Sequence, residues 1–122
     1  MTTNTSPPPR DGTVQPIREW LPQVTQQIAE AVHPRRIILF GSVARGDEGP
    51  GSDLDLMVVF DHLDKARRRE VQAKIMAAVT APVPFDVFVT DIAEFEANKN
   101  VNGTMAYWPA HEGVVVHERS VA

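Results

Sequence analysis

Two short apolar runs, each bounded by residues that end regular structure, constrain the fold of this chain more than any other feature. The first, Ile37–Phe40, stops at Gly41, and the second lies within Asp53–Phe60, after a loop rich in glycine and proline. Runs of this length with such boundaries predict buried strands. Apolar residues at helical spacing occur before, between and after these strands. We therefore predict an α/β (α+β) fold in which helices flank one small mixed β-sheet.

Helical patterns with recognisable ends supply the rest of the predicted architecture. Apolar residues recur at spacings of three and four over Ile17–Val32, and Pro22 inside this pattern marks either the start of the helix or a kink. Asp91, with Glu94 three residues later, predicts an N-cap and a short helix from Ile92. The other predicted elements are a helical turn at 42–46, a helix at 64–79, a strand at 85–90, a helix near 104–111 and a strand or extended tail at 114–116.

Composition limits the classes of protein that this chain can belong to. With 122 residues, it has the length of one domain. Because it has no cysteine, it can form neither a disulfide framework nor a cysteine-bound metal site. Residues 1–13 are polar and rich in proline, which predicts a disordered tail before a domain at residues 14–122. No apolar run is long enough to span a membrane and the tail lacks a secretion signal, so we expect a cytoplasmic protein. The net charge of −4 argues against direct nucleic-acid binding.

Asp53 and Asp55 are the first residues that folding alone does not explain. Side chains two positions apart in a strand point to the same face, while the intervening and following leucines point to the core. Two carboxylates on one face repel each other, and a hard divalent cation such as Mg²⁺ resolves that repulsion. The alternative interpretation is a solvated strand end whose aspartates cap the preceding loop.

A third carboxylate and a small turn add to this pair. Asp86 has only apolar neighbours in the predicted strand, where an aspartate is costly unless it is paired or bound to metal. Gly41 and Ser42 follow a buried strand and open a helical turn, a place where backbone N–H groups and a hydroxyl accept phosphate. Such a turn is also common without any ligand. Together, three acidic groups beside a phosphate-binding turn predict a two-metal site for displacement at phosphorus.

The composite motif resembles the nucleotidyltransferase signature of the DNA polymerase beta superfamily. The sequence reads GSVARG from Gly41, and ten residues separate Ser42 from Asp53, which begins the strand DLDLMVVF. Asp86 stands where the third carboxylate of this superfamily occurs. The resemblance covers residues 17–118, and the short length is similar to that of the minimal nucleotidyltransferases, or MNT proteins. The resemblance implies the nucleotidyltransferase fold.

The resemblance also implies roles for the three carboxylates. Asp53 and Asp55 would hold two Mg²⁺ ions that bridge the triphosphate of ATP. Asp86 would complete the ion that activates the acceptor hydroxyl, or would take the proton of that hydroxyl as general base.

For the turn, the same resemblance implies contacts with the nucleotide. Gly41 and Ser42 would grip the terminal phosphates while pyrophosphate leaves. Arg45 would neutralise developing charge, or would instead pair with Asp47 or Glu48 and hold the loop.

Membership of the MNT group would imply a protein partner. MNT proteins are often encoded with a HEPN-type toxin, and family members transfer AMP from ATP to a tyrosine of that toxin or neutralise it by binding. The expected function is therefore an AMP-transferring antitoxin. The alternatives are a binding-only antitoxin without catalysis and a nucleotidyltransferase that acts on a small molecule of the antibiotic type.

Two further clusters have open interpretations. The basic run Lys65–Arg69 is either a solvated helix face or a contact for an acidic partner or for phosphates. Tyr107, Trp108 and Pro109 either pack in the core or form a partner surface.

Overall fold

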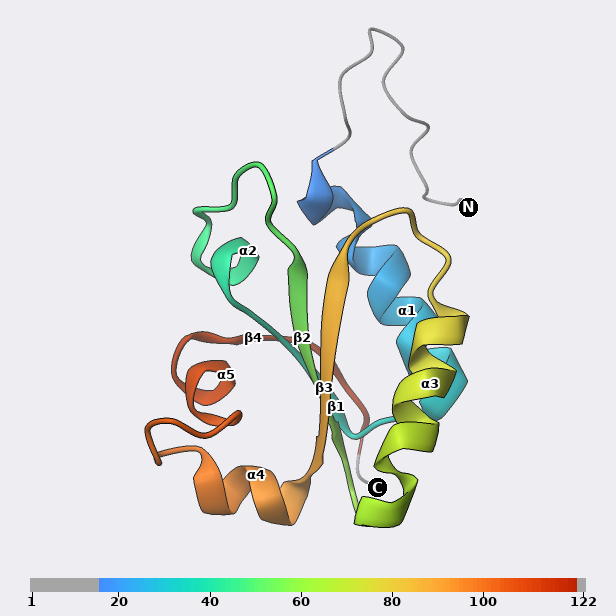
Figure 1. The fold of residues 1–122 in the computed structure, drawn as a ribbon, viewed down its shortest axis with the longest axis vertical. Coiled ribbons are helices and arrows are strands. Elements are labelled where there is room, and N and C mark those ends of the chain that lie inside the picture. Colours follow the sequence, from blue (N-terminus) through green and yellow to red (C-terminus); the bar gives the residue numbers. More distant parts are fainter. Residues whose placement is uncertain (1–15, 121–122) are drawn as a thin grey trace, which may run out of the picture.

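The computed structural model describes residues 16–120, so the tail predicted at residues 1–13 lies outside the described residues. Its strands form one mixed sheet in the order β3-β2-β1-β4 (Figure 1). In chain order the elements are the 3-10 helix η1 (Ile17–Trp20), α1 (Leu21–Val32), β1 (Arg36–Phe40), α2 (Ser42–Arg45), β2 (Leu54–Phe60), the 3-10 helix η2 (Lys65–Arg67), α3 (Arg68–Ala78), β3 (Phe85–Asp91), α4 (Ile92–Asn98), α5 (Tyr107–Glu112) and β4 (Val114–Glu118).

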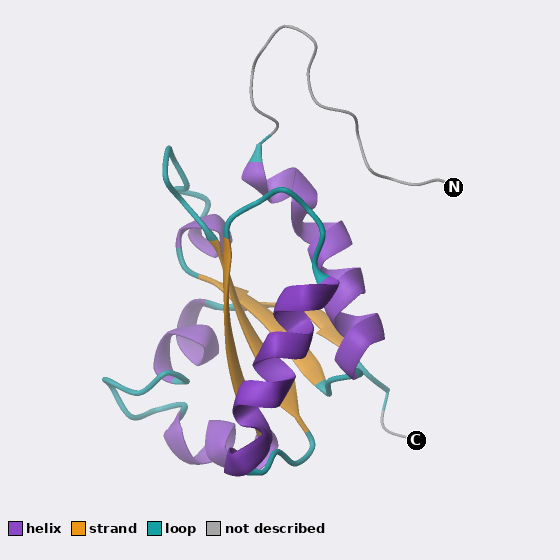
Figure 2. Ribbon diagram, turned by 45° about the vertical axis from the view of Figure 1, so that its right-hand side comes forward, coloured by secondary structure: helices purple, strands orange, loops and turns teal. Residues whose placement is uncertain are grey.

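Helices cover both faces of this sheet, which confirms the predicted fold class. β1 pairs antiparallel with both β2 and β4, whereas β2 and β3 run parallel. The long helices α1 and α3 lie on one face, and α4 and α5 lie on the other (Figures 1 and 2). None of the helices within residues 16–120 combines the length and the apolar character that crossing a bilayer would require.

The central strand β2 is buried on both faces and divides the core into two clusters. Leu54, Leu56 and Val58 face the cluster that packs under α1 and α3. Met57 and Val59 face the smaller cluster, which includes Phe95 of α4. Because a slip of one residue would exchange the two sets, burial on both sides fixes the register of β2 against its neighbours.

Most predicted elements are present, with small shifts at their ends. Pro22 lies in the first turn of α1, where its missing N–H costs nothing, so it marks the start of the helix rather than a kink. The segment at Val114 pairs with β1 as a strand and is not a loose tail. β2 begins at Leu54, so Asp53 lies just outside the strand in which it was predicted.

Asp91 caps α4 as its spacing to Glu94 predicts. Its Oδ1 accepts the N–H of Glu94 at 2.9 Å, and its Oδ2 accepts the N–H of Leu63 at 3.1 Å. The hydrogen bond from the Glu94 backbone lowers the pKa of the Asp91 carboxyl, with a smaller contribution from the Leu63 backbone. One side chain thus joins the end of β3 to both α4 and the loop that follows β2.

Replacing Asp91 with alanine should lower the free energy of unfolding by about 1 kcal/mol, the usual cost of a lost N-cap. The variant Asp91→Asn keeps one acceptor oxygen, so it can accept the N–H of Glu94 but not that of Leu63 as well, and its stability should lie between those of the parent and Asp91→Ala. Because the pKa of Asp91 is lowered in the folded state, its contribution is present above the ordinary aspartate pKa and is lost as the pH falls through the lowered value. Denaturant unfolding of the three proteins at neutral pH measures this, and equal midpoints for Asp91→Ala and the parent would contradict it.

Candidate active site

The strand register places two of the predicted acidic residues side by side. Asp55 of β2 is the direct partner of Asp86 in β3 and of Phe40 in β1. Directly paired residues point to the same face of a sheet. All three side chains therefore stand in one row on the face that α4 and α5 cover, at the end of the sheet next to α2.

The environment of Asp86 differs from the one predicted. It was expected to be costly because all its sequence neighbours are apolar, but its side chain is exposed near the start of β3. That part of the sequence argument is wrong, because alternation in the strand buries Val87 and leaves Asp86 in contact with solvent. Its place beside Asp55 comes instead from the parallel pairing.

The raised pKa of Asp55 is the clearest electrostatic feature of the site. Burial raises the pKa of the Asp55 carboxyl, and the negative charges of Asp86 and then Asp53 raise it further. Arg45 acts in the opposite direction. The three predicted carboxylates therefore lie within electrostatic reach of one another, and a cation at this place would favour the ionised form of Asp55.

Gly41 brings the turn after β1 into contact with this acidic cluster. Its backbone has φ 80° and ψ −158°, a region that is essentially open only to glycine. A Cβ built on Gly41 would lie 2.2 Å from Oδ2 of Asp55, closer than two atoms can approach. The absence of a side chain at residue 41 therefore lets the Gly-Ser turn lie directly against Asp55.

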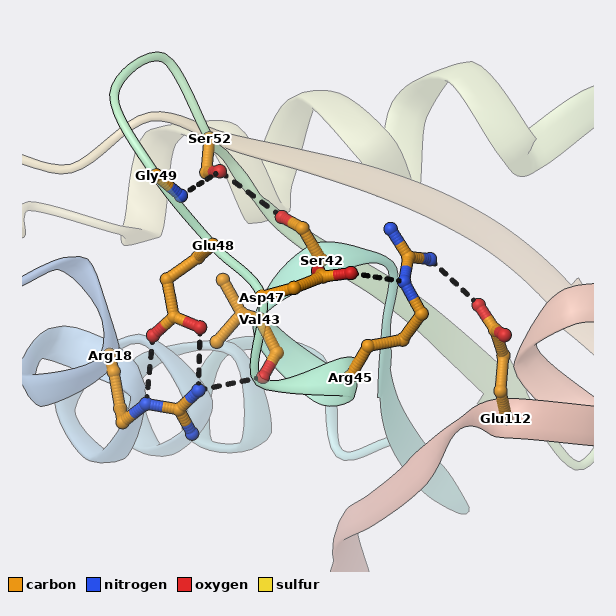
Figure 3. Close-up of polar contacts among 9 residues, drawn as sticks. All are labelled: Arg18, Ser42, Val43, Arg45, Asp47, Glu48, Gly49, Ser52 and Glu112. Atoms are coloured by element: carbon orange, nitrogen blue, oxygen red, sulfur yellow. Dashed lines mark hydrogen bonds and ion pairs between the residues drawn. The ribbon is translucent and has the colours of Figure 1, made fainter.

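Hydrogen bonds between serines hold the turn and the following loop together (Figure 3). The Ser42 hydroxyl donates to Oγ of Ser52 at 3.2 Å, and the N–H of Gly49 donates to the same oxygen at 2.9 Å. The first N–H groups of a helix have no partner within it. At the start of α2 such groups directly follow Gly41, which lies against Asp55. Phosphate binding by this turn stays a prediction.

Arg45 joins the turn to a distant helix as well as to its own loop. Its Nε binds Asp47 at 3.2 Å, which agrees with one of its two predicted roles, and its Nη1 binds Oε1 of Glu112 at 2.9 Å. These carboxylates raise the pKa of Arg45, first through the hydrogen bond with Glu112. Figure 3 shows the guanidinium between the loop and α5. Glu112 cannot be recognised from the sequence, because nothing local marks a residue that comes from a distant part of the chain.

Arg18 is a second residue of the site region that sequence analysis missed. Its Nε and Nη2 bind the two carboxylate oxygens of Glu48 at 2.9 and 2.8 Å, and Nη2 also donates to the carbonyl oxygen of Val43 at 2.9 Å (Figure 3). This two-bond geometry orients both partners. The 3-10 helix η1 is thereby joined to α2 and to its loop, and Glu48 pairs with Arg18 rather than with Arg45.

The donor atoms of the site suit a magnesium ion. Among residues 16–120, no group of three or more His, Cys, Asp and Glu side chains is assembled closely enough to hold a metal ion. Mg²⁺ does not require such a cage, because it is commonly bound by one or two carboxylates together with substrate phosphates. Asp55 beside Asp86, next to a turn that carries no side chain at Gly41, fits that pattern.

Carboxylates beside a glycine-serine turn, on a small mixed sheet, have the donor atoms that metal-assisted transfer of phosphorus-containing groups requires. Comparison with protein families makes this specific: residues 21–109 match the nucleotidyltransferase domain family, and the chain belongs to it. Domains of this family generally use a nucleoside triphosphate and a divalent metal ion. No curated protein gives a match to the chain.

One solved structure supports the fold. A protein from Sulfolobus solfataricus, provisionally described as a nucleotidyltransferase, is 18% identical, with a TM-score of 0.61 over 84% of this chain and 81% of that one. A second structure with the same provisional description is 24% identical and has a TM-score of 0.44, covering 66% of this chain and 87% of the other. At this identity the first comparison supports the fold and nothing finer.

Removing the charge of Asp55 should stabilise the protein in the absence of ligands. Its raised pKa means that the folded state binds more protons than the unfolded state just above the ordinary aspartate value of about 3.9, so stability falls as the pH rises through that window. Asp55→Asn should therefore raise Tm by a few degrees at pH 7, and the gain should shrink below that ordinary value. Calorimetry at both pH values measures this, and a lower Tm at pH 7 would contradict it.

Adding a methyl group at Gly41 should be more costly than at a glycine with open space. Gly46 has a similar φ of 81° and nothing within 4 Å of a built Cβ, so Gly46→Ala is the control. Gly41→Ala should lose about 1–3 kcal/mol from its backbone alone. The contact with Asp55 should lower the free energy of unfolding further. In the double variant with Asp55→Ala, part of this further loss should be absent. Denaturant unfolding of the double-mutant cycle measures the coupling, and a coupling of zero would show that the contact is not present.

Proposed function

We propose that this nucleotidyltransferase domain transfers AMP from ATP to a hydroxyl group, and that the acceptor is a tyrosine of a HEPN-type toxin for which the protein acts as antitoxin. The observation that carries the chemical part is the pairing of Asp55 with Asp86 beside Gly41. The identity of the toxin rests on the resemblance of the motif to the minimal nucleotidyltransferases. The cytoplasmic location expected from the sequence stays a prediction.

The proposed roles follow the positions of the side chains. Asp53 and Asp55 would hold two Mg²⁺ ions, and Asp86 would either complete the one nearer the acceptor or act as general base for the acceptor hydroxyl; the ions would supply charge neutralisation on the triphosphate. Gly41 and Ser42 would position the terminal phosphates. Each of these residues lies at the same end of the sheet, because Asp55 pairs with Asp86 and with Phe40, the residue before Gly41.

The proposed reaction is an in-line displacement at the α-phosphorus. The acceptor oxygen forms a bond to this phosphorus, while the bond between it and the oxygen that bridges to the β-phosphorus breaks. Pyrophosphate leaves with that electron pair. The proton of the acceptor hydroxyl passes to Asp86 where this residue acts as general base, and to solvent where it is a ligand of the ion. Arg45, which already lowers the pKa of Asp55, adds positive charge near the leaving group.

A macromolecular acceptor agrees with the openness of the acidic cluster. Asp86 is exposed at the sheet end, and Asp55 is only half-buried. A tyrosine on the surface of another protein can therefore approach Asp86 from solvent. The basic run does not form a uniform docking surface, because Arg68 is half-buried and binds Glu94 and the carbonyl of Val89.

Labelling with ATP tests the proposal. The protein is incubated with Mg²⁺, a HEPN-type toxin encoded beside it, and ATP labelled either at the α- or at the γ-phosphate. Transfer of AMP should label the toxin from α-labelled ATP only. Asp53→Asn should lower this labelling by at least about a hundredfold, because it removes a ligand that acts in the transition state.

The controls separate catalysis from binding. Asp64→Asn removes an exposed carboxylate outside the site and should label the toxin as the parent does. If the toxin stays unlabelled while Asp53→Asn still rescues cells from it, the protein is a binding-only antitoxin. Label on a small hydroxylated antibiotic, but not on the toxin, would indicate the small-molecule activity instead.

A further inference from the structure

A pocket next to the acidic cluster shares Gly41 and Arg45 with the proposed phosphate site, but its other lining residues have no role in the function proposed so far. It is lined by Phe40, Gly41, Arg45, Trp108 and Glu112, and its volume is about 270 Å³. Residues from β1, α2 and α5 thus meet there, and two of its five lining residues are aromatic. Of the two interpretations of Trp108, packing in the core is wrong, because its side chain is 53% exposed and contributes to this pocket.

The pocket lies on a defined side of the carboxylates. Asp86, Asp55 and Phe40 form one row across β3, β2 and β1, and the pocket begins at Phe40, the end of that row opposite Asp86. In the proposed function the acceptor hydroxyl stands at Asp86. The nucleotide donor must then occupy the side of β1 and α2, and the pocket is where its nucleoside would extend.

The aromatic wall of the pocket is held in place before any ligand arrives. Tyr107 packs edge-on against Trp108, with ring centroids 5.0 Å apart at 89°, and stacks on His111 at 4.2 Å. Phe40 in turn packs against Phe88, with centroids 5.7 Å apart. Aromatic faces that need no rearrangement bind a flat ring at low entropic cost.

Size and polarity narrow the class of ligand. Pockets for whole drug-sized molecules have volumes of roughly 300–1,000 Å³, so this one suits a single ring system with the phosphates outside it. Arg45 binds Oε1 of Glu112, and a carboxylate has further lone pairs that accept hydrogen bonds. An exocyclic amino group on the ring is a suitable donor for them.

We infer that this pocket is the base subsite of the donor nucleotide and that it favours a purine with an amino group, which stacks on Trp108 and donates to Glu112. The inference rests on the proposed function, because it requires that the triphosphate lie at the Gly-Ser turn. It assigns to α5 a role in selecting the substrate, in addition to its role in covering the sheet.

Calorimetric titration in the presence of Mg²⁺ tests the inference without turnover. The probes are inorganic triphosphate and the ATP and UTP analogues in which a methylene group replaces the bridging oxygen between the α- and β-phosphorus. The parent should bind the ATP analogue more tightly than either the UTP analogue or inorganic triphosphate. Trp108→Ala should raise the Kd of the ATP analogue by about tenfold or more, as expected for a lost base stack. The Kd of inorganic triphosphate should not change.

Met76→Ala is the matched control, since Met76 is a large apolar residue on α3 with a similar exposed fraction of 49%. It should leave all three dissociation constants unchanged. Equal binding of the ATP analogue and inorganic triphosphate by the parent, or an equal loss of both in Trp108→Ala, would overturn the base subsite while the proposed function stood. If neither probe binds the parent, the proposed function fails and the base subsite fails with it.

Discussion

The repulsion among carboxylates at one end of the sheet is the constraint around which this region is built. Asp55 and Asp86 are neighbours because β2 and β3 run parallel in a fixed register, and that register is fixed by burial of β2 on both faces. The core therefore holds two like charges together that would separate in an open chain. This repulsion lowers the stability of the folded protein when no ligand is bound, and it attracts a cation to the site. Functional sites commonly lower the stability of the fold in this way.

Around that cluster, specific contacts hold the Gly-Ser turn and the following loop in position. Gly41 removes the atoms that would keep the turn away from Asp55, and the pair of serines holds the turn and the loop. Arg18 and Arg45 each bind carboxylates and lie on opposite sides of α2 (Figure 3). A one-turn helix has little stability of its own, so these contacts are what keep its start in position.

The sequence predicted the elements well because their signals are local. Apolar spacing indicated the helices and strands, and the N-cap at Asp91 followed from a residue three positions away. The Gly-Ser turn and the Asp53–Asp55 pair were recognisable for the same reason. The contacts of Arg18 and Glu112 were not, since each joins residues that are distant in the chain and depends on how α2 packs. The exposure of Asp86 was also misjudged, because apolar neighbours in a strand say little about the face on which one residue lies.

The ion pair between Arg45 and Glu112 connects the last helix, α5, to the carboxylates at the sheet end. These partners are 67 residues apart in the chain, yet the same guanidinium that Glu112 holds also reduces the proton affinity of Asp55. A shift of α5 that released Arg45 would change the charge balance at the sheet end without moving any carboxylate. The position of α5 and the charge at Asp55 are therefore linked through one arginine side chain.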